Sequence, residues 1–107
     1  MPDVFRVIIK WAANPFRGDR FEEGWLPAAQ AALDYGATSW AFYRALDGRL
    51  DFIQEATFES KADWERYWYS ERLAAARAEL SGLYQVPLLP AMWEVVGEGS
   101  LVSLESD

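Results

Sequence analysis

The sequence contains no cysteine and no histidine. Without cysteine, this chain cannot form disulfides, thiolate nucleophiles or cysteine-ligated metal sites. Histidine is the commonest general base, the commonest metal ligand and the usual proximal haem ligand, so sites built on it are excluded as well. A glycine-rich phosphate loop and a pair of carboxylates flanking one site are also missing. We therefore expect neither a bound metal ion nor a cofactor.

Positive charge is scarce too. Ten basic residues stand against 17 acidic ones, which gives a net charge of −7, and Arg17 and Arg20 are close together but isolated. Nucleic acids and anionic membranes both repel such a chain. The sequence also has no apolar run of 18 residues and no charged-then-apolar segment at its N-terminus. We expect a cytoplasmic protein with no nucleic-acid or membrane partner.

Aromatic residues, in contrast, are abundant. They make up 16% of the 107 residues, and 51% of the chain is hydrophobic, enough for one domain with a substantial core. Aromatic side chains at this density suit a core, a ligand pocket or an oligomer interface. We predict one domain over residues 1–97. The tail, residues 98–107, is expected to be either disordered or an extra strand.

Periodicity and turn signals divide the chain into six elements. Strands are predicted over 4–11, 37–46, 49–58 and 91–96, and helices over 19–35 and from 61 to about 80. Ser60 with Asp63 forms a capping-box-like helix start, and Asp19 is the expected cap of the first helix. Pro27 predicts a kink or a frayed first half, and a second kink or break is expected near Ser70. Asp47 and Gly48 predict a two-residue type I′ turn, with positive φ at both positions.

The order βαββαβ predicts an α+β, ferredoxin-like fold, in which a four-stranded antiparallel sheet carries helices on one face. The first and third strands then lie side by side at the centre. The face without helices would expose two isoleucines among charges, which favours a homodimer through that face. Its predicted residues are Arg6, Ile8, Lys10, Asp51, Ile53 and Glu55, with Arg6 and Glu55 as the strongest charge pair.

One stretch resembles a known family. The strand-to-helix run from Phe52 to Ser60, followed by Trp64 and Trp68, is similar to the dimeric α/β-barrel superfamily and to its antibiotic-biosynthesis-monooxygenase-like branch. The likeness spans residues 4–97. It implies a homodimer whose two sheets close into a barrel, with a pocket in each protomer between sheet and helices. Cofactor-free monooxygenases of that branch oxidise electron-rich aromatic substrates with Asn, Trp, Tyr and Arg side chains. The haem-degrading branch needs a histidine that this chain lacks.

These residue types select the candidate residues of a pocket. Each of these side chains could also have a purely structural role instead. The aromatic members could instead pack the core, Asn14 could serve the turn before Pro15, and Gln54 could be a core amide with protein partners. Arg72 could form an ordinary surface ion pair. The candidates are Asn14, Trp25, Gln54, Trp64, Tyr67, Trp68 and Arg72.

Two functions remain open at this point. The first is a metal-free, monooxygenase-like enzyme that acts on an aromatic or polyketide-like compound. The second is a non-catalytic small-molecule-binding or accessory protein of the same fold. Isomerase or cyclase activity is a further alternative, for which the sequence offers no motif that could test it. A ligand-sized cavity lined by Trp64 and Trp68 would favour the enzyme, whereas tight packing there would favour the non-catalytic protein.

Overall fold

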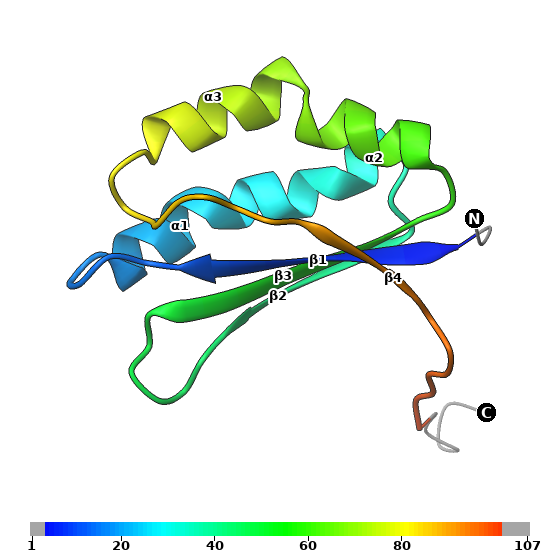
Figure 1. Cartoon of the computed structure of the whole chain (residues 1–107), viewed down its shortest axis with the longest axis horizontal. Helices are drawn as coiled ribbons and strands as arrows, with labels where there is room; N and C mark the ends of the chain where they lie inside the picture. The colour runs from blue at the N-terminus through cyan, green and yellow to red at the C-terminus, as the bar shows by residue number, and fades with distance from the viewer. Residues whose placement is uncertain (1–3, 102–107) are drawn as a thin grey trace, which may run out of the picture.

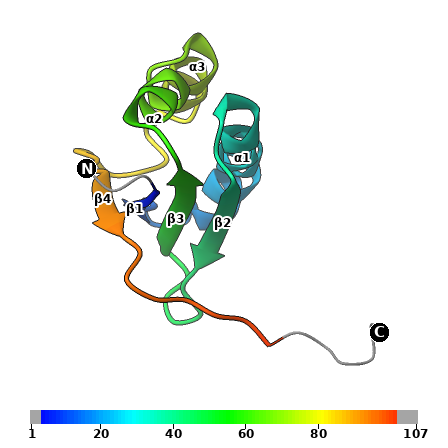
Figure 2. The same cartoon turned by 90° about the vertical axis from the view of Figure 1, so that its right-hand side faces the viewer.

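The chain folds into one sheet with all its helices on one face, as Figures 1 and 2 show from two directions. The computed structural model describes residues 4–101. Its sheet has the order β2-β3-β1-β4, and every neighbouring pair is antiparallel. This confirms the predicted ferredoxin-like fold. The elements are β1 (Phe5–Ala12), α1 (Gly18–Gln30), a 3-10 helix (Ala31–Tyr35), β2 (Ser39–Arg44), β3 (Asp51–Phe58), α2 (Lys61–Trp68), α3 (Glu71–Glu79) and β4 (Ala91–Glu94).

Alternation along the central strands separates the two faces of the sheet. On β1 the odd-numbered side chains are buried beneath the helices and the even-numbered ones lie on the open face. On β3 the even-numbered side chains, from Phe52 to Phe58, face the helices. The helix-facing side chains of β1 are Phe5, Val7, Ile9 and Trp11. The core therefore fills the layer between sheet and helices. Among the described residues, no helix is both long and apolar enough to cross a membrane.

Serine caps begin both helices that follow β3. The Ser60 hydroxyl accepts a hydrogen bond from the backbone N–H of Asp63 at 3.0 Å, and Ser70 accepts one from that of Leu73 at 3.2 Å. Each cap supplies a partner to an amide that the first helical turn leaves free. The predicted cap at Ser60 is confirmed, and the break expected near Ser70 separates α2 from α3.

The first helix differs from its prediction at both ends. Asp19 does not cap it: the helix begins at Gly18 without a side-chain cap, and the Asp19 carboxylate accepts a 2.8 Å hydrogen bond from Arg44. Pro27 does not interrupt the helix, which reaches Gln30 and passes into the 3-10 helix. The carbonyl that Pro27 leaves free belongs to Glu23, an exposed residue, so water can satisfy it.

The β2–β3 hairpin is confirmed, but its predicted turn is wrong. The connection is six residues long, 45–50, and positive φ values fall on Gly48 and Arg49. A backbone hydrogen bond from Ala45 to Asp51 closes the loop at 2.8 Å. The Arg44 side chain donates to the carbonyl of Arg49 at 2.9 Å, and this contact supports the wider loop.

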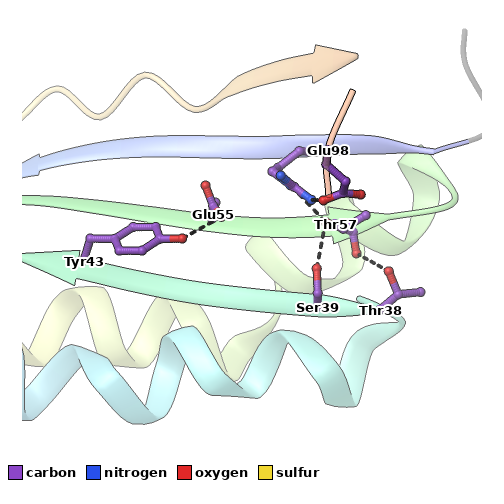
Figure 3. A network of polar contacts seen from close by, with 7 residues as sticks. Thr38, Ser39, Tyr43, Glu55, Thr57 and Glu98 are labelled. Carbon is purple, nitrogen blue, oxygen red and sulfur yellow. Dashed lines mark hydrogen bonds and ion pairs between the residues drawn. The ribbon is translucent and has the colours of Figure 1, made fainter. Parts of the chain in front are cut away.

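The open face carries a polar network that corrects the predicted charge pair. Arg6 lies opposite Thr57 and donates to its hydroxyl at 3.1 Å, while its ion-pair partner is Glu98 at 3.0 Å. Glu55 instead accepts a hydrogen bond from the Tyr43 hydroxyl at 3.0 Å (Figure 3). The Arg6–Glu55 pair was therefore wrong, because Glu55 lies only diagonal to Arg6 in this register. Residues 98–101 form no strand, and residues 102–107 lie outside the described part of the chain.

Candidate functional site

Gln54 lies at the centre of a buried hydrogen-bond network on the helix side of the sheet. The Gln54 side chain, only 2% exposed, accepts hydrogen bonds at Oε1 from the indole N–H of Trp11 at 3.1 Å and of Trp25 at 2.9 Å. Its Nε2 donates to the hydroxyl of Tyr67 at 2.9 Å, and that hydroxyl donates to the carbonyl of Ala28 at 2.7 Å. We call these residues the glutamine network. It connects β1, β3, α1 and α2 through one amide.

The network gives every polar side-chain atom in it a protein partner. An amide oxygen has two lone pairs, and the two indoles occupy both. A buried amide without partners would cost about 1–3 kcal/mol. Both polar atoms of the Gln54 amide have protein partners, so its burial does not require a ligand. The structure thus favours the core-amide alternative for this residue.

Aromatic rings pack around the glutamine network. The Trp11 ring lies 4.6 Å from Trp25 and 5.0 Å from Tyr84, measured between ring centroids. Trp64 and Trp68 stack at 5.4 Å, and both are buried. Such offset and edge-on contacts are the arrangements that aromatic pairs favour in cores. These rings form the packed layer under the helices.

Asn14 and Arg72, the two remaining pocket candidates, form contacts at the surface. The Asn14 side chain donates to the carbonyl of Gly82 at 2.7 Å, and its backbone N–H donates to Leu83 at 2.8 Å. Arg72 forms an exposed ion pair with Asp34 at 2.9 Å. The structure therefore brings Trp25, Gln54 and Tyr67 into direct contact, places Trp64 and Trp68 in the same packed layer, and uses Asn14 and Arg72 elsewhere.

Arg77 is a residue that the sequence did not point to. Its guanidinium lies 4.3 Å from the centre of the Trp68 ring, and its Nη2 donates to the carbonyl of Trp68 at 2.9 Å. Its Nη1 is the one buried side-chain polar atom of the described residues without a protein partner. Burial lowers the pKa of this guanidinium. Helical spacing could not reveal the contact, because the break at Ser70 changes the helical phase between positions 68 and 77.

Burial also raises the pKa of Tyr67 above its usual value of 10, although the hydrogen bond from Gln54 and the nearby charges of Arg77 and Arg72 act in the opposite direction. The folded protein therefore keeps the Tyr67 proton at pH values where the unfolded chain releases it. The stabilisation is complete below pH 10 and is lost as the pH rises through the folded pKa.

We expect Tyr67→Phe to flatten the pH dependence of stability above pH 10. Each pH unit in this range costs the wild-type protein up to about 1.4 kcal/mol through this one group. Urea unfolding at pH 8 and pH 11 measures the difference, and Tyr69→Phe, at an exposed tyrosine, is the control. Equal pH dependence in wild type and Tyr67→Phe would contradict the assignment.

Among residues 4–101, four prominent surface hollows have volumes of about 300 to 750 Å³, and Trp64 and Trp68 line none of these four. The largest lies between α1 and the end of α3, beside Arg17, Arg20 and Leu80. Another, of about 340 Å³, opens on the helix-free side near β4. These four hollows are therefore at the surface, and their lining does not include the tryptophans of the predicted pocket.

Solved structures share this architecture at low sequence identity. One is named a "putative antibiotic biosynthesis monooxygenase" from Nitrosomonas europaea; it superposes with a TM-score of 0.79 over 92% of this chain and 97% of its own, at 10% identity. This chain and that protein therefore share the ferredoxin-like fold. SnoaB, a cofactor-independent oxygenase from Streptomyces nogalater, superposes with a TM-score of 0.76 over 90% of this chain and 96% of its own, at 11% identity.

A third neighbour, also named a "putative antibiotic biosynthesis monooxygenase", comes from Caulobacter crescentus. It has a TM-score of 0.77, with 90% of this chain and 92% of its own covered at 13% identity. No family model and no curated protein matches the sequence. Identities this low establish a common fold and leave activity to the residues of the site.

Proposed function

We propose that this chain is a homodimeric binding or accessory protein of the dimeric α/β-barrel type, with a packed core where an enzyme of this fold would hold its substrate. The glutamine network is the observation that carries this proposal. The side chains of Trp11, Trp25 and Tyr67 each form a hydrogen bond of 2.9 to 3.1 Å with the Gln54 amide, so a ligand would have to break good hydrogen bonds to enter. Catalysis would need a pocket at that place.

The open sheet face supports the dimer. Ile53 on β3, Tyr43 on β2 and Trp93 on β4 are 39%, 51% and 56% exposed. The strand pairs Tyr43↔Ile53, Lys10↔Ile53 and Arg6↔Trp93 place these residues on the same face as Ile8. No helix covers this side of the sheet (Figure 2). Large apolar side chains gathered on one face are typical of an association surface. Packing two such faces together would remove them from water.

A cofactor-independent oxygenase is the second candidate, and Arg77 favours it. The Arg77 guanidinium lies over the Trp68 ring, and its buried Nη1, which has no protein partner among the described residues, could hold the phenolate of an aromatic substrate. The substrate anion would reduce dioxygen itself: a ring CH₂ becomes C=O, and the second oxygen atom leaves as water. The fold of SnoaB, a cofactor-independent oxygenase, also supports this candidate.

Oxygen uptake with an anthrone-type phenol separates the two candidates. For the proposed binding or accessory role, we expect the rate of oxygen consumption to equal the rate without protein. Catalysed uptake of one O₂ per substrate, lost in Arg77→Met and kept in Arg72→Met, would overturn the proposal and establish the oxygenase. Arg72 is a suitable control because it lies on the same helix and pairs with Asp34 at the surface.

A further inference from the structure

The largest of the four hollows lies between α1 and the end of α3, on the helix side of the sheet, and has a volume of about 750 Å³. One wall consists of Arg20, Gly24 and Pro27, which the helical repeat places on the same side of α1. Residues 79–83 form the other wall. The proposed homodimer packs through the opposite, helix-free face, so it leaves this hollow open (Figure 2).

The base of the hollow is apolar and already packed. Leu80 is 9% exposed and belongs to the core, and Leu83 is partly buried against the same core. Gly24 lets α1 approach closely, since a Cβ at position 24 would lie 2.5 Å from the Cδ2 atom of Leu80. The hollow is large enough for a ligand of several linked groups, because small-molecule sites have volumes of about 300–1,000 Å³.

Two guanidinium groups and two carboxylates stand around this apolar base. They belong to Arg17, Arg20, Glu23 and Glu79, which are all exposed and form no ion pair among residues 4–101. A ligand with charge of one sign would be repelled by half of these groups. A ligand that carries both charges can be attracted by all of them. Glu79 also ends α3, where the negative end of the helix dipole favours a cation.

We propose that this hollow binds a short peptide with free ends. Its terminal carboxylate lies on Arg17 and Arg20, because planar guanidinium groups match carboxylates. Its terminal ammonium lies on Glu79, and an apolar side chain between them packs on Leu80 and Leu83. A single amino acid holds both charges on one carbon atom, whereas a peptide separates them enough to reach both walls. The inference rests on the proposed binding role and gives that role a ligand class and a place.

The test titrates isotope-labelled full-length protein with the tripeptide Ala-Leu-Ala and follows its amide chemical shifts by NMR. We expect saturable shifts at the amides of Gly24 and Gly82, which both line the hollow. Arg20→Gln should weaken binding about threefold to tenfold, because one charge-assisted contact is lost. When the carboxyl end of the peptide is amidated, wild type and Arg20→Gln should bind it equally.

The ammonium end of the peptide is tested in the same way. Glu79→Gln should weaken binding of the free peptide by a similar factor, whereas the N-acetylated peptide should bind equally to wild type and Glu79→Gln. Lys61→Gln and Glu65→Gln are the matched controls, because each removes one exposed charge from α2 and neither residue lines the hollow. Both controls should bind the free peptide as wild type does.

Three results would overturn the inference: no saturable shift at the hollow, a peptide blocked at both ends that binds as tightly as the free one, or an equal loss of affinity in the control variants. A failed titration leaves the dimer and the packed core unaffected. Catalysed oxygen uptake would overturn the proposed function whatever the titration gives, so the two proposals fail separately.

Discussion

Gln54→Leu is expected to lower the free energy of unfolding by about 3 kcal/mol or more, although leucine is apolar and similar in length. The substitution leaves the indole N–H groups of Trp11 and Trp25 buried without an acceptor, and Tyr67 loses a donor. Each stranded group costs about 1–3 kcal/mol. Urea unfolding followed by far-UV circular dichroism measures the difference.

Gln30→Leu is the matched control, because Gln30 is exposed at the end of α1. It should change stability by less than about 0.5 kcal/mol. If Gln54→Leu were as stable as Gln30→Leu, the glutamine network would not hold these elements together. The main argument for a closed core would then be lost.

Ile8→Glu is expected to separate the proposed homodimer into monomers. Ile8 lies on the open face of β1, a central strand, and a homodimer through this face brings the two substituted positions close together. Two carboxylates would then enter an apolar interface, at a cost of several kcal/mol. Size exclusion with light scattering should give the mass of a single 12.2 kDa chain for the variant and twice that for wild type.

Leu33→Glu is the control for this experiment. Leu33 is 48% exposed on the 3-10 helix, away from the open face, so its substitution should leave the mass unchanged. An unchanged mass for Ile8→Glu would place the association surface elsewhere. Since no part of the oxygen-uptake experiment depends on Ile8, the dimer and the absence of turnover are tested independently.

The strand faces and the α2 cap could be read from the sequence because local rules determine them. Side chains alternate along β1, so its apolar positions identified the buried face, and Ser60 with Asp63 is a local capping pattern. The hairpin turn could not be read in the same way. Its form depends on the Arg44 side chain, which holds the carbonyl of Arg49 from outside the turn.

Residue types at the candidate site were predictable, but their roles were not. The sequence grouped Trp25, Gln54 and Tyr67, and the structure brings them into contact. Whether such a group encloses a pocket or fills it depends on how side chains from four elements pack together. The spacing of residues along the sequence does not determine that packing. Arg6 shows the same limit, because its partner Glu98 is 92 residues away.

One amide shared by two indoles also constrains how this lineage could change. A descendant chain that gained a pocket by replacing Trp25 with a smaller residue would lose one of the two hydrogen bonds that Gln54 Oε1 accepts. The replacement of Gln54 alone would leave the indole N–H groups of Trp11 and Trp25 without an acceptor. Evolution from this core to a substrate chamber therefore passes through less stable intermediates, unless two substitutions arise together.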